Sequence, residues 1–296
     1  MRFDYYQSTV PESVGSGEVI HLLSEAGHEL KPMHHGAMGY KQGFELGQGG
    51  TAFGRLYVGG QKGTTHLVAS GEHTGLLVAF LRGRLPDDHL VTRADAAQDY
   101  NEPGAYERLR DALRPIAQKH RLAFLQYADE IHPTSGRTQY VGSAQSACRV
   151  RAYEKGKQQA AIMRASMPGL NGPMEFLNEE TGELVHSDNW SRAEAQVRPP
   201  EEWSRRWMAK ATPEQVWSCS PWLVESASVL FDVRLDRFIM TRRKQTTDER
   251  AFEMMCSQYR KAIRQAIDRC GSVEDLGAHM LQVIDGVESR ERLGIV

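Results

Sequence analysis

Three short segments, far apart in the chain, share one pattern: an arginine, an alanine, and then an acidic residue or a tyrosine. They are Arg93-Ala94-Asp95, Arg151-Ala152-Tyr153 and Arg192-Ala193-Glu194. The composition around each segment predicts a β-strand, and alternate side chains of a strand share one face of the sheet. If the three strands are neighbours, two carboxylates and a tyrosine meet on one face with cations around them.

The middle segment lies within residues 136–158, a stretch rich in small residues, hydroxyls and cations. Strand alternation predicts that Arg151, Tyr153 and Lys155 project together from one face. A phenol held between two fixed cations suits a tyrosine that meets a phosphate. An ordinary ladder of cations and tyrosine on a solvated sheet is the alternative, and this stretch taken alone favours that alternative.

The order of predicted elements indicates an α+β fold. Glycine-rich residues 39–71 predict hairpins that turn at Gly49-Gly50 and Gly59-Gly60, and residues 106–120 predict an amphipathic helix. After Pro200 the composition changes, and residues 201–227 hold four of the five tryptophans. We therefore expect a mostly antiparallel sheet with flanking helices in residues 1–205, followed by a helical C-terminal region in residues 206–296.

Overall charge does not indicate a nucleic-acid partner, because the formal net charge is only −2. Local charge does: cations gather between Arg137 and Arg164, and a second basic cluster is Arg242-Arg243-Lys244. The scattered cysteines form no C-x-x-C pair, so a zinc ribbon is not expected. Without a signal peptide or an apolar run long enough to span a bilayer, we expect a cytoplasmic protein with no membrane partner.

The two acidic strand residues are candidate metal ligands. Paired carboxylates from different strands suit a hard cation such as Mg²⁺ or Mn²⁺, which would polarise a phosphodiester and favour attack by a tyrosine. The alternative is that Asp95 and Glu194 form structural salt bridges with Arg93, Arg151 or Arg192. Spacing alone does not decide between the two.

A longer pattern contains the middle segment: Gly136-x-Thr138-x-Tyr140-x-Gly142-Ser143-x-x-Ser146, then Arg151-x-Tyr153-x-Lys155-Gly156. It resembles the hallmark of the replication initiation factor family (Rep_trans), whose members start rolling-circle replication in plasmids, integrative elements and filamentous phages. The resemblance extends to Val91-Thr92-Arg93-Ala94-Asp95 with Asp99, and to Arg192-Ala193-Glu194. It covers roughly residues 1–200 and implies a nicking domain like that of replication initiators and relaxases.

The resemblance implies a role for each matched residue. Tyr153 would attack the scissile phosphate of origin DNA, giving a 5′-phosphotyrosine and a free 3′-OH, while Arg151 and Lys155 hold that phosphate. The DNA backbone would be contacted by Tyr140, Ser143, Ser146 and Arg149. The ligands of Mg²⁺ or Mn²⁺ would be Asp95, Glu194 and Asp99, with Glu130 and His66 as competitors.

The resemblance also implies partners: single-stranded or hairpin origin DNA, a host helicase and a polymerase. It leaves open whether the protein acts as a homodimer. Two other functions stay open as well, a non-catalytic DNA-binding regulator on the same fold and an RNA- or protein-binding module. For the basic C-terminal helices, duplex recognition or self-association competes with a solvated charged surface.

Overall fold

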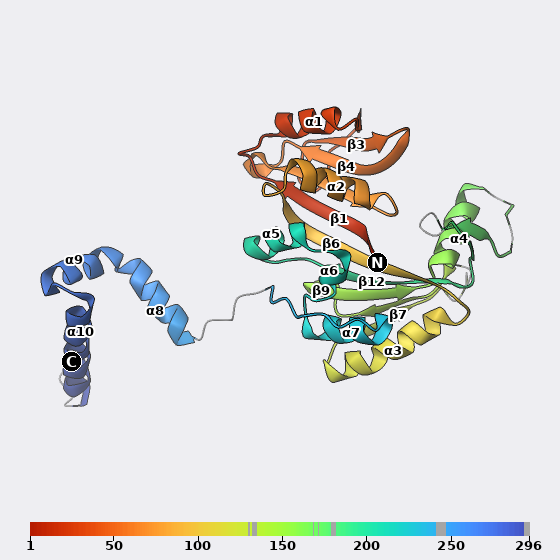
Figure 1. Ribbon diagram of the computed structural model, residues 1–296. Helices are drawn as coiled ribbons and strands as arrows, with labels where there is room; N and C mark the ends of the chain where they lie inside the picture. The colour runs from red at the N-terminus through yellow and green to blue at the C-terminus, as the bar shows by residue number, and fades with distance from the viewer. Residues whose placement is uncertain are drawn as a thin grey trace. The chain divides into compact units, whose positions relative to one another are not determined.

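The computed structural model describes residues 1–129, 131, 135–167, 169–170, 172–178, 182–240 and 247–292 (Figure 1). The chain forms two compact units, Met1–Thr241 and Arg242–Val296. Arg242-Arg243-Lys244 and Glu130, both singled out from the sequence, lie outside the described residues. None of the described helices combines the length and the apolarity needed to cross a bilayer.

The first unit is built on one ten-stranded sheet in which every neighbouring pair is antiparallel, in the order β2-β3-β4-β5-β1-β6-β12-β9-β8-β7. A separate two-stranded hairpin joins β10 (Glu175–Leu177) to β11 (Leu184–His186). The strands of the large sheet are β1 (Arg2–Val10), β2 (Glu29–Pro32), β3 (Gln42–Gln48), β4 (Thr51–Val58), β5 (Thr65–Ser70), β6 (Leu90–Asn101), β7 (Phe124–Tyr127), β8 (Thr138–Val141), β9 (Cys148–Tyr153) and β12 (Trp190–Val197). The expected fold class is confirmed.

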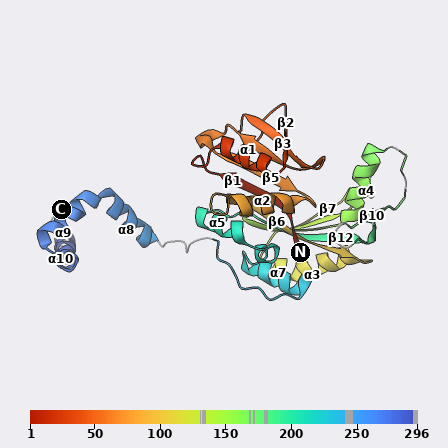
Figure 2. The same ribbon diagram turned by 45° about the horizontal axis from the view of Figure 1, so that its top comes forward.

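Helices cover one face of the large sheet, and the core lies between the two layers. In Figures 1 and 2, α3 and α7 lie side by side, while α4 and the small hairpin extend beyond one end of the sheet. The helices of this unit are α1 (Ser16–Glu25), α2 (Thr74–Arg84), α3 (Ala105–Lys119), α4 (Lys155–Ser166), α5 (Glu202–Lys210), α6 (Pro213–Val216) and α7 (Pro221–Phe231), with a 3₁₀ turn at Gln61–Gly63.

The repeated Arg-Ala-x pattern follows from this layering. Ala94, Ala152 and Ala193 are fully buried and belong to the core beneath the helices. Strand alternation sends the arginine and the third residue of each segment to the opposite face, which is polar. The small alanines let the helix layer approach the sheet closely, so the pattern encodes a core position between two positions of the polar face.

The first predicted hairpin turn is confirmed. Gly49 (φ 58°) and Gly50 (φ 80°) join β3 to β4 in the left-handed conformation that a tight two-residue turn requires. The second turn is longer than predicted. Gly59 (φ 73°) leaves β4 as expected, but the 3₁₀ turn at Gln61–Gly63 follows before β5 begins.

The first unit extends beyond the boundary expected at residue 205, which falls inside α5. Trp217 and Leu223 are fully buried in the same core as the sheet. The change in composition after Pro200 therefore marks the start of the second layer of this unit, because the tryptophan-rich helices α5–α7 fill the space over the sheet. The second unit contains α8 (Thr247–Gln258), α9 (Arg260–Cys270) and α10 (Val273–Arg292).

Candidate active site

The three strands that carry the repeated pattern are neighbours in the order β6-β12-β9 (Figure 1). By strand alternation their candidate functional residues share the polar face. Glu194 on β12 lies opposite Arg151 on β9 and opposite Ala97 on β6. Tyr153 lies two residues beyond Arg151 on β9, and Asp95 lies two residues before Ala97 on β6. Glu194 is therefore the centre of a diagonal line that runs from the tyrosine to the second carboxylate.

Tyr153 is held beneath Arg151. The guanidinium lies 4.3 Å from the centre of the tyrosine ring, and its Nη2 donates to the phenol oxygen at 3.4 Å. Burial raises the pKa of the phenol, and the negative charge of Glu194 raises it further, whereas Arg192 and Arg151 lower it. The phenol is protonated at neutral pH in this state, and the two guanidinium groups are the cations that would stabilise its phenolate.

Arg151 also pairs with Glu194, to which its Nη2 donates at 2.7 Å. On the same face, the Arg149 guanidinium stacks on Tyr140 with its carbon 3.7 Å from the ring centre. Within the described structure, Nε of Arg149 and Nε of Arg151 are buried and have no hydrogen-bond acceptor. Buried donors normally have partners, so this pair of arginines offers unused N–H groups to an anion such as a phosphate.

Asp95 is fully buried and forms a two-pronged ion pair with Arg93, whose Nε donates to Oδ1 at 2.8 Å and whose Nη2 donates to Oδ2. The pKa of Asp95 is raised to about 7 by burial and by the negative charge of Glu194, although Arg93 opposes this. The salt bridges that the sequence left open as an alternative are thus present for both carboxylates. Glu194 therefore lies close enough to Asp95 for its negative charge to act on that carboxyl.

Two carboxylates this close to one another fit a divalent hard cation. Mg²⁺ is often held by one or two carboxylates, with water and substrate phosphate completing its shell. Within the described residues no cluster of three or more His, Cys, Asp or Glu side chains could hold a metal. Asp95 and Glu194 are thus the candidate pair for such a cation, and in this state Arg93 and Arg151 engage them instead.

Asp99 is committed elsewhere, although it lies on the same strand as Asp95. Arg192 donates to its two carboxylate oxygens at 2.6 and 2.8 Å, and to Asp4 at 2.6 Å, while Arg2 approaches it at 3.3 Å. Burial acts to raise the pKa of Asp99, but the hydrogen bonds from Arg192 outweigh it and the pKa is lowered. Asp99 is thus paired with arginines in this structure, and it is not placed beside Asp95 and Glu194 as a third metal ligand.

Lys155 does not share the strand face with Tyr153, so the predicted alternation fails there. Strand β9 ends at Tyr153, and Lys155 begins α4. The ammonium group lies 6.0 Å from the Trp190 ring and lines a hollow of about 340 Å³ together with Arg192. Burial and the charge of Arg192 lower the pKa of Lys155. The lysine thus reaches the region of Tyr153 from the helix.

The junction between β9 and α4 is fixed by Glu154. Arg137 donates to its carboxylate from the backbone nitrogen at 2.7 Å and from Nε and Nη2 at 3.0 and 2.8 Å. Lys157 adds a bond at 2.9 Å, and together these contacts lower the pKa of Glu154 to about 2 against the effect of burial. A side chain at Gly156 would collide with the backbone oxygen of Ser187 at 2.3 Å, which explains the glycine that follows Lys155.

The residues expected to contact DNA divide into two groups. Tyr140 lies opposite Arg151 on β8, next to Arg149. Ser143 and Ser146 lie in the turn between β8 and β9 and are hydrogen-bonded to each other at 3.0 Å. That turn is at the end of β9 away from Tyr153, so the serines border the face rather than the tyrosine.

His66 is a satisfied sheet histidine. Its ring nitrogens lie 2.8 Å from Gln7 Nε2 and 3.1 Å from Thr9 Oγ1, and burial lowers its pKa to about 4. These contacts occupy both ring nitrogens with protein groups on β1. His66 therefore fits a structural role in the sheet better than the metal-ligand role for which it was a competitor.

Sequence reasoning missed the contribution of β1 to the site. Asp4 reaches Arg192, and Tyr5 lies opposite Asp95, with a break in register between Phe3 and Tyr5. The Arg93 guanidinium stacks on the Tyr5 ring, with its carbon 4.1 Å from the ring centre. The run Phe3-Asp4-Tyr5-Tyr6 could have indicated these residues, but it lacks the Arg-Ala-x pattern of the other three strands.

The chain is similar to a solved rolling circle replication initiator protein from Geobacillus stearothermophilus. The two share 22% sequence identity and superpose with a TM-score of 0.45, over 84% of this chain and 89% of that chain. No family model and no curated protein matches the chain. Membership of the replication initiation factor family therefore stays a prediction from the sequence pattern.

Proposed function

We propose that the protein nicks and rejoins single-stranded or hairpin DNA through Tyr153, as a rolling-circle replication initiator does. The observation that carries this proposal is the placement of Tyr153, Arg151 and Glu194 on neighbouring strands, with Asp95 one step beyond. A phosphate that enters this face meets a phenol, guanidinium groups with unused donors and a carboxylate pair. Nucleophilic attack, phosphate binding and metal binding thus each have candidate residues on this face.

In the proposed reaction the phenol oxygen of Tyr153 attacks the scissile phosphorus. A bond forms between that oxygen and phosphorus, and the bond from phosphorus to the 3′ oxygen breaks. The phenol proton passes to water, the 3′ oxygen takes a proton from water, and the products are a 5′-phosphotyrosine and a 3′-OH. The reverse attack by a 3′-OH rejoins the strand, so no external energy source is consumed.

Because burial raises the pKa of Tyr153, forming its phenolate costs free energy in the proposed reaction. Arg151 and Arg192 lie close enough to lower that pKa, and they offset part of the cost. The buried Nε donors of Arg149 and Arg151 would bind the phosphate oxygens, which gain charge as the phosphorus is attacked. Lys155 would contact the phosphate from the α4 side.

Asp95 and Glu194 are the residues that would hold Mg²⁺ or Mn²⁺. A divalent ion bound there supplies a positive charge that polarises the phosphodiester. Arginines engage all three carboxylates, but Asp95 lies beside a second carboxylate, Glu194, whereas the charged groups acting on Asp99 are Arg192 and Arg2. We therefore assign Asp99 a structural role. Tyr140 and Arg149 are proposed as a contact for the DNA backbone or a base beside the reacting phosphate.

The proposal is tested by incubating the full chain with Mn²⁺ and a labelled pool of random-sequence single strands. We expect a labelled band at the mass of protein plus DNA that resists denaturation, and sequencing the trapped strands would identify the preferred origin. Tyr140→Phe is the matched control, because Tyr140 is also a tyrosine beneath an arginine on this face. Loss of the band with Tyr153→Phe but not with Tyr140→Phe supports the proposal; a band that survives Tyr153→Phe contradicts it.

The burial of Tyr153, which is 2% exposed, favours a second candidate: a DNA-binding regulator that does not cut. Such a protein would use the same arginines and would bind single strands with an affinity that falls steeply with salt. It would form no denaturation-resistant adduct with Mg²⁺ or Mn²⁺. The same experiment therefore separates the two candidates.

A further inference from the structure

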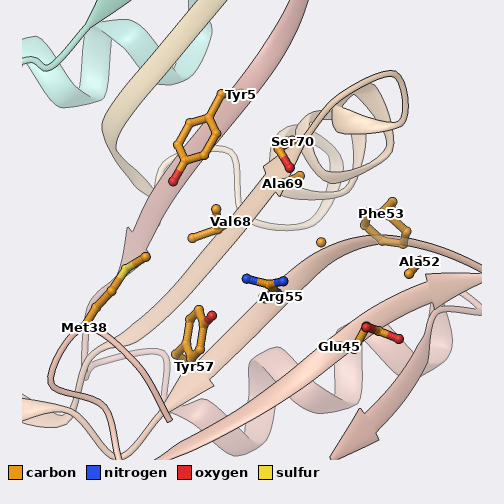
Figure 3. Close-up of a pocket in the computed structure, with 11 residues that line it drawn as sticks. Tyr5, Met38, Glu45, Ala52, Phe53, Arg55, Tyr57, Val68, Ala69 and Ser70 are labelled. Carbon is orange, nitrogen blue, oxygen red and sulfur yellow. The ribbon is translucent and has the colours of Figure 1, made fainter. Parts of the chain in front are cut away.

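A hollow of about 270 Å³ lies on the sheet on the far side of Asp95 from Tyr153. Figure 3 shows side chains from β1, β3, β4 and β5 around it, with Met38 from the loop between β2 and β3 at one side. Apart from Tyr5, which lies opposite Asp95, none of these side chains belongs to the candidate active site. The polar and aromatic ones are Tyr5, Glu45, Arg55, Tyr57 and Ser70.

Tyr5 lies between the hollow, which it lines, and Asp95 on the neighbouring strand. Tyr5 lies opposite Asp95 on one side and opposite Ser70 on the other. Its ring also carries Arg93, the partner of Asp95. From β9 to β5 is four strand spacings, or about 19 Å at ~4.8 Å each, so a DNA strand attacked by Tyr153 would reach the hollow within a few nucleotides.

Two charged groups in the hollow are not paired with each other. Arg55 and Glu45 lie directly opposite on β4 and β3 and share one face. In the part of the chain that the structure describes, no ion pair or side-chain hydrogen bond joins them to one another or to another group. Arg55 is exposed and Glu45 is half-buried, so their charges face the hollow without being neutralised.

The lining resembles the surface on which a base stacks. Tyr5 supplies a half-buried aromatic ring. Tyr57 is only 2% exposed and forms the wall beside it, fixed by ring contacts with Tyr40 and His66, each 6.4 Å between centres. Aromatic side chains stack on unpaired bases in proteins that bind single strands. The volume is below the roughly 300–1,000 Å³ of sites for drug-sized ligands, which suits one base.

We propose that this hollow binds one unpaired base of the DNA strand that lies across Tyr153, and that it selects guanine. The inference rests on the proposed function for the identity of the strand. Guanine presents acceptors at O6 and N7, which a guanidinium fork matches, and a donor at N2, which a carboxylate accepts. Arg55 and Glu45 supply that complementary pair from neighbouring strands.

The test uses the Tyr153→Phe chain without metal, so that no cleavage interferes with binding. Fluorescence anisotropy compares labelled thymidine tracts that carry at their centre one guanine, one adenine or one abasic site. The guanine strand should bind at least about fivefold more tightly than the other two, since one well-made base contact discriminates by about 1–3 kcal/mol. Equal affinity for the guanine and abasic strands would overturn the proposal.

Arg55→Lys and Glu45→Gln locate the effect. Arg55→Lys keeps the charge but loses the planar fork, and Glu45→Gln keeps the shape but loses the charge. Arg55→Lys should remove the preference for guanine, and Glu45→Gln should reduce it, because the glutamine oxygen still accepts from N2 but without the charge. Binding to the plain thymidine tract should stay within about twofold. Lys31→Gln is the matched control, because Lys31 lies opposite Glu45 on β2 but does not line the hollow. It should keep the guanine preference; guanine preference that survives Arg55→Lys, or that Glu45→Gln leaves undiminished, overturns the proposal.

The pocket and the nicking reaction can fail separately. Covalent adduct formation by chains that retain Tyr153 reports the reaction, whereas anisotropy of the Tyr153→Phe chain reports the pocket. Guanine preference without any adduct would support the pocket and remove the nicking reaction. An adduct without guanine preference would support the reaction and overturn the pocket.

Discussion

Arg151 donates a hydrogen bond to Glu194 at 2.7 Å across the pairing of β9 with β12. The same nitrogen faces the phenol of Tyr153 at 3.4 Å, so one guanidinium connects the candidate nucleophile to the candidate metal ligand. This contact fixes the arginine in place, and it leaves the Nε donor of that arginine unused. The position of Arg151 is the feature on which the proposed chemistry most depends.

Replacing Arg151 with lysine should slow adduct formation by roughly a hundredfold. Lysine keeps the positive charge, but it lacks the fork that reaches Glu194 and the phenol together. Adduct formation over time on one trapped origin strand measures the effect. Arg149→Lys, two residues away on the same strand, should slow adduct formation less, because Arg149 stacks on Tyr140 and not on the nucleophile. Equal effects of the two substitutions would show that Arg151 has no special role.

The carboxylates Asp95 and Asp99 should respond differently to neutralisation. Asp95→Asn should raise the Mn²⁺ concentration needed for half-maximal adduct formation by at least about tenfold, because it removes one of the two proposed ligands. Asp99→Asn should leave that concentration within about twofold of the wild-type value.

Asp99→Asn should instead lower the free energy of unfolding, because it leaves Arg192, which is 1% exposed, with one charged partner fewer. Arg192 keeps Asp4 as a charged partner, so the expected loss is about 1.5–3 kcal/mol by urea denaturation. If Asp99→Asn shifts the metal requirement as strongly as Asp95→Asn does, the structural role assigned to Asp99 is incorrect.

Glu154 predicts a loss of stability in acid. Its pKa is about 2 in the folded chain and 4.5 ordinarily, so the stabilisation is complete above pH 4.5 and is lost as the pH falls through 2. The side chain is 6% exposed, and the stabilisation is at most about 3 kcal/mol. The difference in unfolding free energy between wild type and Glu154→Gln should shrink between pH 4.5 and pH 2. A constant difference over that range would mean that the carboxylate charge does not stabilise the junction.

Much of the fold could be predicted from the sequence because strand alternation and glycine turns are local. The pattern Arg-Ala-x marks one core position between two positions of the polar face, and it appears in β6, β9 and β12, which are neighbours. The end of β9 could not be predicted in this way. The close approach of Gly156 to Ser187 and the anchoring of Glu154 by Arg137 turn the chain into α4 before Lys155, and both contacts depend on tertiary structure.

The site was predictable only where its residues repeat a pattern. Tyr5 and Asp4 reach the site because β1 pairs with β6 through an irregular register, which no local spacing reveals. The engagement of Asp99 by Arg192 likewise depends on which strands are neighbours. The first unit ends at Thr241 and not near residue 205 as expected. Helices that cover a sheet and helices of a separate unit have similar compositions, so composition alone did not distinguish them.

The most direct test of the central claim is to locate the covalent bond. The DNA adduct formed with Mn²⁺ is digested with nuclease and trypsin, and the modified peptide is sequenced by mass spectrometry. The proposed chemistry predicts a nucleotide joined through its 5′-phosphate to Tyr153, in the tryptic peptide of residues 152–155. A phosphonucleotide on Tyr140 or on any other residue would contradict it.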